Sequence, residues 1–163
     1  MCSPIRHACR QYIVNLKRYF LFQAKTEGEI KLYFIELGVE CAKTHRITPE
    51  EMDLLHKHEL PDSETAKCFL ACIYKKANWL DDKGMYDLKG ILDMANKDIE
   101  SDQLDNAKKL FELCDKVNKE EVSDGDKGCE RAGHIFTCIT KNAAKCGFEI
   151  YPNREQASEH SGH

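Results

Sequence analysis

Apolar residues recur every three to four positions from residue 28 onward, which is the spacing of one face of an α-helix. The first such row is Ile30, Phe34, Leu37 and Cys41. Five further segments repeat the pattern, with inward positions at Met52, Leu54 and Leu55; at Ala66, Phe69, Leu70 and Ile73; at Met85, Leu88, Leu92, Ala95 and Ile99; at Leu104, Ala107, Phe111, Cys114 and Val117; and at Ala132, Ile135, Phe136, Ile139 and Ala143. No convincing alternating pattern for a strand occurs, so the sequence predicts a compact all-α domain of six helices.

Polar residues mark the expected ends of these helices. Residues 48–51 read Thr-Pro-Glu-Glu, a capping box with proline at the first helical position, so a helix should begin there. Asp62-Ser63-Glu64 should open the third helix, and Ser101-Asp102 should end the fourth helix and cap the fifth. Residues 78–84 are expected to form a turn, and residues 123–128 a loop.

Composition narrows the choice of partners. The chain has 163 residues, enough for one domain with a substantial core. Its formal net charge is −4 and it carries no basic stripe, which argues against nucleic acid or an anionic membrane surface as a partner. No apolar run approaches the roughly 18 residues that a membrane-spanning helix needs, so membrane insertion is not expected.

Cysteine is the most informative residue type in this chain. Cys68 and Cys72 lie on one face of a helix, with Cβ atoms about 5–6 Å apart, farther than the disulfide optimum of about 3.8 Å. They should therefore bridge to two different segments, which requires an oxidising compartment. The total is nine, an odd number that leaves at least one thiol free or paired between chains: Cys2, Cys9, Cys41, Cys68, Cys72, Cys114, Cys129, Cys138 and Cys146.

The spacing of six of these cysteines resembles that of the insect odorant-binding protein family. Gaps of 26, 3, 41, 14 and 8 residues separate Cys41, Cys68, Cys72, Cys114, Cys129 and Cys138. Residues 68–72, followed by Lys75-Lys76 and by Asp81-Asp82-Lys83-Gly84, are similar to that family's third helix and the turn after it. The resemblance covers about three quarters of the chain, and it implies the interlocked pairs Cys41–Cys72, Cys68–Cys129 and Cys114–Cys138 around an apolar cavity.

Parts of the chain depart from the pattern of that family. The 14-residue gap between Cys114 and Cys129 is longer than expected. Cys2, Cys9 and Cys146 have no place in the pattern, and pairing of Cys146 with either of the other two stays open.

The resemblance also implies a function, namely reversible binding and transport of small hydrophobic ligands, such as odorants or pheromones, in extracellular fluid. It implies no cofactor and no chemistry, and the protein partner could be an odorant receptor or a second copy of the chain. Trp79 is the candidate gate, and Phe148, Ile150 and Tyr151 are candidates for a lid. The residues expected to bind the ligand are Phe34, Leu37, Leu54, Phe69, Ile73, Trp79, Met85, Leu88, Leu92, Phe111, Ile135, Phe136, Ile139 and Phe148.

The sequence offers little support for a metal site or an enzyme. Cys68 and Cys72 have a spacing found at zinc sites, but no second close pair of cysteines accompanies them. No phosphate-binding loop, zinc-protease motif or nucleophile elbow occurs, so an enzyme is not expected. A secreted, disulfide-rich interaction protein with a filled core is the alternative.

Histidines offer a trigger for ligand release. His56, His58 and His134 have ordinary pKa values near 6.5, and a proton placed beside apolar surface is costly. His134 is the strongest candidate because Ile135 and Phe136 follow it, although an exposed His134 without effect on binding is the simpler expectation.

Residues 1–25 are predicted to lie outside the fold. The apolar run Tyr19–Phe22 is too short for the core of a signal peptide. Either a misassigned start or exon, or a genuine extension, would explain this segment. The expected divisions are residues 1–25 as an extension, 26–150 as the helical domain and 151–163 as a polar tail.

Overall fold

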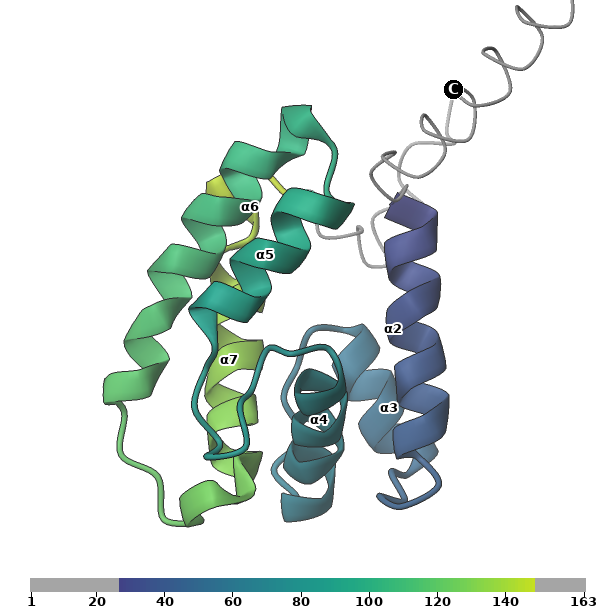
Figure 1. Cartoon of the computed structure of the whole chain (residues 1–163). Coiled ribbons are helices and arrows are strands. Elements are labelled where there is room, and N and C mark those ends of the chain that lie inside the picture. The colour runs from purple at the N-terminus through teal and green to yellow at the C-terminus, as the bar shows by residue number, and fades with distance from the viewer. Residues whose placement is uncertain (1–26, 149–163) are drawn as a thin grey trace, which may run out of the picture.

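The structure, a computed structural model, describes residues 27–148 and contains six α-helices in that range (Figure 1). Three short 3-10 helices follow or connect them, and the only β-pairing among these residues is a single bridge between Leu80 and Tyr86. The prediction of an all-α, six-helix domain is therefore confirmed. The elements are α2 (Glu27–Cys41), α3 (Pro49–His56), α4 (Glu64–Lys76), α5 (Leu88–Asp98), α6 (Ser101–Cys114), η1 (Asp115–Lys119), η2 (Gly125–Lys127), α7 (Cys129–Asn142) and η3 (Ala144–Cys146).

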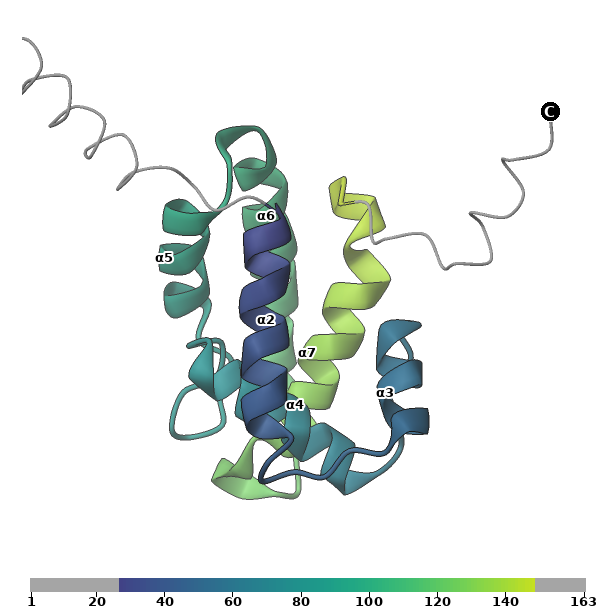
Figure 2. The ribbon, with the colours of Figure 1, turned by 90° about the vertical axis from the view of Figure 1, so that its right-hand side faces the viewer.

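Helices α4 and α7 pack against each other at the centre of the molecule. Helix α2 packs against α4 on one side, while α6 packs against α7 and α5 on the other. In Figure 1 the upper part of α2 stands apart from α5 and α6, whereas its lower end approaches α4. Figure 2, turned by 90°, shows α3 and α5 on opposite sides of the molecule.

Side-chain caps start α3 and α4 where the sequence indicates. The backbone N–H of Glu51 donates to Thr48 Oγ1 at 3.1 Å, and the Thr48 N–H donates to Glu51 Oε2 at 2.9 Å, which completes the capping box. Ser63 is the N-cap of α4, because its hydroxyl accepts from the N–H of Ala66 at 3.1 Å.

The two following helices begin elsewhere than the sequence indicates. Helix α5 starts at Leu88 rather than Met85, because the Asp87 carboxylate caps the Gly90 N–H at 3.0 Å. Helix α6 has Glu100 as its N-cap, with no side-chain cap bond, so the expectation that Ser101-Asp102 caps it was wrong. Within α5, Ile91 and Ala95 are fully buried, whereas the predicted Leu88 and Leu92 are half-buried.

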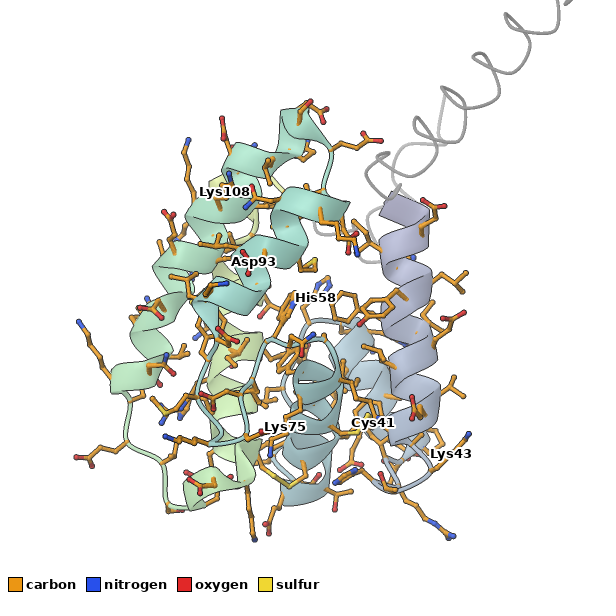
Figure 3. All side chains as sticks on the ribbon, in the orientation of Figure 1. Cys41, Lys43, His58, Lys75, Asp93 and Lys108 are labelled. Carbon is orange, nitrogen blue, oxygen red and sulfur yellow. A yellow bond between two sulfur atoms is a disulfide. The ribbon has the colours of Figure 1, made fainter. Side chains whose placement is uncertain are left out.

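Three disulfides join the helices in a chain. Cys41–Cys72 links α2 to α4, Cys68–Cys129 links α4 to α7, and Cys114–Cys138 links α6 to α7. These are the pairs that the resemblance implies, and Figure 3 shows Cys41 between α2 and α4. The paired cysteines are 31, 61 and 24 positions apart in the sequence. By limiting the conformational entropy of the unfolded chain, each disulfide therefore stabilises the fold by about 3–4 kcal/mol.

The described part of the chain has no helix both long and apolar enough to cross a membrane.

Candidate ligand-binding site

The position of Trp79 follows from the way α4 ends. Asn78 adopts a left-handed conformation (φ 59°) directly after the helix. The Trp79 N–H donates to the Tyr74 carbonyl at 2.7 Å, and the Asn78 N–H donates to the Lys75 carbonyl at 3.2 Å. This is the bonding of a Schellman motif, which turns the chain back over the last helical turn. The indole of Trp79 is therefore folded against α4.

The segment after Trp79 holds it from the other side. The Asp87 N–H donates to the Trp79 carbonyl at 2.9 Å, next to the bridge between Leu80 and Tyr86. Tyr86 in turn exchanges two hydrogen bonds with the Asn118 side chain, at 2.8 and 2.9 Å. Asn78 before Trp79 and Leu80 after it are thus both held by backbone hydrogen bonds. The Trp79 ring therefore has a defined place in the interior.

Aromatic rings from three helices surround Trp79. Its indole stacks on Tyr74 of α4, with ring centroids 5.4 Å apart and planes at 14°. Phe34 of α2 and Phe111 of α6 meet it edge-on, each with a centroid distance of 5.4 Å. Tyr33 extends the group through Phe34 at 5.5 Å. We call these five residues the aromatic cluster.

Most residues predicted to bind ligand lie in or against the same core. Five of them are buried: Phe69, Ile73, Trp79, Phe111 and Ile135. Seven are half-buried and pack against the core: Phe34, Leu37, Leu88, Leu92, Phe136, Ile139 and Phe148.

Two predicted residues lie outside that packed set. Helix α3 packs Leu55 and Met52 onto the core, while Leu54 is half-buried on another side of the helix. Met85 precedes α5, and its sulfur accepts a hydrogen bond from the Arg131 guanidinium at 3.9 Å. Neither residue therefore has the position that a regular helical row predicts.

Tyr74 and Tyr86 are buried core residues that the sequence interpretation missed. Tyr74 continues the row of Ala66 and Leu70 at four-residue spacing, so the helical pattern contained the signal for it. Burial raises the pKa of both phenols, and for Tyr86 the charge of Asp115 adds to that effect. The Tyr86 hydroxyl donates to the Phe111 carbonyl at 2.9 Å, which ties the turn before α5 to α6.

Comparison with known proteins agrees with this architecture. The model of the PBP/GOBP family matches residues 23–142. The chain belongs to the PBP/GOBP family. It is 26% identical over 132 residues to general odorant-binding protein 19d of Drosophila melanogaster, a match that covers 78% of this chain and 83% of that protein.

Solved structures of insect odorant-binding proteins share the fold of this PBP/GOBP member. Odorant-binding protein dmelOBP28a from Drosophila melanogaster superposes with a TM-score of 0.59 at 22% identity, covering 75% of this chain and 98% of that chain. Apis mellifera odorant binding protein 5 gives a TM-score of 0.60 at 17% identity, covering 77% and 99%.

The chain end after α7 also turns back onto the core. Gly147 is left-handed (φ 83°), and the Phe148 N–H donates to the Ala143 carbonyl at 3.0 Å, again as in a Schellman motif. The positive φ favours glycine at this position, and a Cβ atom there would lie 2.8 Å from the Asn106 side-chain amide, which would have to shift. Phe148 consequently packs against the core, while the other two residues of the predicted lid, Ile150 and Tyr151, lie outside the described residues.

Two surface crevices have a polar character and contain none of the predicted ligand-binding residues. The first, of about 420 Å³, is lined among others by Lys67, Lys116, Lys141, Glu120, Glu130 and His134. The second, of about 480 Å³, is lined by Thr44, His45, Arg46, Glu64, Thr65 and Cys68. Neither matches the apolar lining that a hydrophobic ligand requires.

The histidines considered as release triggers lie in different surroundings. His134 faces the first crevice, where its Nδ1 is 2.7 Å from Glu120 Oε2. His56 is exposed. His58 is half-buried and left-handed (φ 61°), and burial lowers its pKa below 6.5. In the view of Figure 3 it lies between α5 and α2, above α4.

The cysteines outside the three disulfides and the possible metal ligands are considered together. Cys146 is half-buried in η3 and lies outside the three disulfides, whereas Cys2 and Cys9 are outside the described residues. Within residues 27–148, no group of three or more His, Cys, Asp or Glu side chains is placed to hold a metal ion.

Proposed function

We propose that this PBP/GOBP protein binds small hydrophobic ligands reversibly beside the aromatic cluster and transports them in extracellular fluid. The observation that carries the proposal is the meeting of α2, α4 and α6 at Trp79 through apolar and aromatic side chains. The relative from Drosophila melanogaster is named an odorant-binding protein, which supports the same class of ligand. Binding here needs no cofactor and makes or breaks no covalent bond.

The energetics favour a carrier that releases its ligand. A volatile that buries about 250–350 Å² of apolar surface gains about 6–9 kcal/mol at 25 cal/mol per Å². Loss of translational and rotational freedom offsets several kcal/mol of that gain. Micromolar affinity follows, with broad selectivity among ligands of similar size.

The proposal includes secretion and a definite binding domain. Three disulfides within 122 residues are stable only in an oxidising compartment, which supports an extracellular location. Residues 26–150 would form the binding domain, flanked by residues 1–25 and 151–163. Deleting residues 1–25 should then leave ligand affinity and the thermal midpoint unchanged within a few degrees.

A displacement titration tests the proposal. The oxidised full chain is titrated with a hydrophobic fluorescent probe, and a panel of volatiles is then used to displace it. Trp79 is the only tryptophan of the chain, so its intrinsic emission reports ligand uptake directly. We expect one saturable site and a change in Trp79 emission, whereas folded protein that binds nothing across a broad panel would contradict the proposal.

One observation favours the alternative of an interaction protein with a filled core. Leu32, Ile35 and Val39 form an apolar row on α2 and are 54%, 52% and 62% exposed. Such a row is typical of a protein-binding surface. This second function would be supported if the folded protein takes up no probe but self-associates or binds an odorant receptor. A carrier should instead bind the probe whether it is a monomer or a dimer.

A further inference from the structure

The indole N–H of Trp79 has no hydrogen-bond partner within the described part of the chain. Trp79 is only 9% exposed, and among residues 27–148 no atom accepts a hydrogen bond from its Nε1. Buried polar groups in folded proteins are nearly always paired, because an unpaired donor has lost its bond to water without replacement. This donor therefore requires an explanation.

The buried hydroxyl of Tyr86, which lies close to Trp79, does have a partner. The hydroxyl of Tyr86 donates to the Phe111 carbonyl, while the ring of the same Phe111 packs against Trp79. Two further buried atoms in the described range lack partners, Asp124 Oδ1 and Arg131 Nε. Each belongs to a group that is bonded through another atom, because Asp124 Oδ2 accepts from the Glu130 N–H and Arg131 Nη1 donates to two carbonyls. Trp79 has no second polar atom in its side chain.

The place of this donor indicates what would pair with it. Trp79 lies among the residues predicted to bind ligand, with Phe34 and Phe111 at its edges. An indole N–H donates and cannot accept, so its partner must supply an acceptor atom. A charged carboxylate would be costly beside these rings, whereas a neutral carbonyl or ester oxygen is not.

We propose that the Trp79 indole donates a hydrogen bond to a neutral oxygen of the bound ligand. The protein thereby selects aldehydes, ketones and esters over hydrocarbons of the same shape. This inference rests on the proposed function, because it assumes that a ligand binds beside the aromatic cluster. It makes Trp79 a determinant of specificity in addition to a core residue.

A matched ligand pair isolates the hydrogen bond. The ketone 2-undecanone and the alkene 2-methyl-1-undecene differ by an oxygen in place of a CH₂ group. The dissociation constants of both are measured by displacement of an extrinsic probe, for the native chain and for Trp79→Phe. The change of this ratio between the native chain and the variant cancels the different hydration of the two ligands, because that hydration is the same for both proteins. We expect Trp79→Phe to reduce the preference for the ketone about three- to tenfold. Leu110→Val, at a buried position outside the predicted ligand-binding residues, keeps the donor and should leave the preference unchanged.

Two further measurements do not depend on the folding of Trp79→Phe. Benzothienylalanine at position 79 keeps the shape of the indole and replaces only the N–H by sulfur, so it should lose the same preference. The single tryptophan also gives a single indole N–H resonance, which should move further downfield with the ketone than with the alkene. Both readouts report on the donor itself.

The outcomes separate this inference from the proposed function. If both ligands bind and the ratio is unchanged without the N–H, the inference is wrong and the donor instead faces an aromatic ring, while the carrier function stands. If neither ligand binds to folded protein, both proposals fail.

Discussion

Trp79 stacks on Tyr74 because the left-handed Asn78 between α4 and Trp79 reverses the chain. In a Schellman motif the residue two positions after the cap commonly packs on the residue three positions before it. Here those two residues are aromatic, so the Schellman motif that ends α4 also brings two members of the aromatic cluster together. The ending of α4 and the candidate binding site therefore depend on the same few residues.

Asn78→Val should destabilise the fold and disturb Trp79. Asparagine tolerates a positive φ, whereas a β-branched residue there costs about 1–2 kcal/mol. We expect a fall of several degrees in the thermal midpoint and a red shift of Trp79 emission, measured by circular dichroism and fluorescence. Asn96→Val, at an exposed position inside α5, is the control and should leave the emission unchanged. Equal effects of the two variants would contradict the role given to Asn78.

The sequence predicted the features of the fold that depend on the local pattern of residues. Helical spacing identified six helices, and the capping box at Thr48 and Glu51 is present in the structure. The start of α5 was missed because Met85, Leu88 and Leu92 continue a helical spacing. In the fold, Met85 instead accepts from the Asp81 N–H and Tyr86 pairs with Leu80, and no local pattern reveals such pairing.

The site was predicted less completely than the fold. The spacing of apolar residues shows which side of a helix faces inward, but not which residue on that side is buried most deeply. In α5 the predicted Leu92 is half-buried, whereas its neighbour Ile91 is fully buried. His134 precedes Ile135, yet one step along a helix turns it away from the core toward Glu120. The unpaired N–H of Trp79 had no signal in the sequence, because it depends on what three other elements place around it.

Each of the three disulfides should be necessary for full stability. Peptide mapping without reduction should recover Cys41–Cys72, Cys68–Cys129 and Cys114–Cys138. Replacing both cysteines of any pair by serine should lower the free energy of unfolding by about 3–4 kcal/mol, measured with urea. Cys146→Ser is the matched control and should cost little, because Cys146 is outside the bridges. A different pairing, or a large loss for Cys146→Ser, would overturn this assignment.

Arg131 should stabilise the segment after α6 through its buried guanidinium. It is 5% exposed and donates from Nη1 to the carbonyls of Val117 and Glu120. Arg131→Met keeps most of the volume and removes these bonds, so we expect a loss of about 1.5–3 kcal/mol in urea unfolding. Lys127→Met, which removes only an exposed ion pair with Glu64, should cost at most about 0.5 kcal/mol. Equal stabilities would show that the bonds of Arg131 contribute nothing net.

His58 should make the fold less stable as the pH falls below 6.5. Burial lowers its pKa in the folded state, so between that pKa and 6.5 the unfolded chain binds more protons than the folded one. Stability therefore rises with pH in this window and is lost as the pH falls through it. Side-chain hydrogen bonds lower the pKa values of Glu40, Glu51 and Glu130 below 4.5, so these groups add a decline of the same sign near pH 5. This decline is common to the native chain and to a His58 variant, so the difference between the two proteins still reports on His58.

The test is urea unfolding between pH 7.5 and 5.0. His58→Asn suits the left-handed backbone and removes the titrating ring, so the decline of stability with pH should become shallower. His56→Asn, at an exposed position two residues earlier, should keep the native decline. Ligand affinity measured over the same range should follow His58 rather than His134, since His134 faces Glu120 in a polar crevice that contains none of the predicted ligand-binding residues. A decline of the same slope in the native chain and in His58→Asn would contradict the role given to His58.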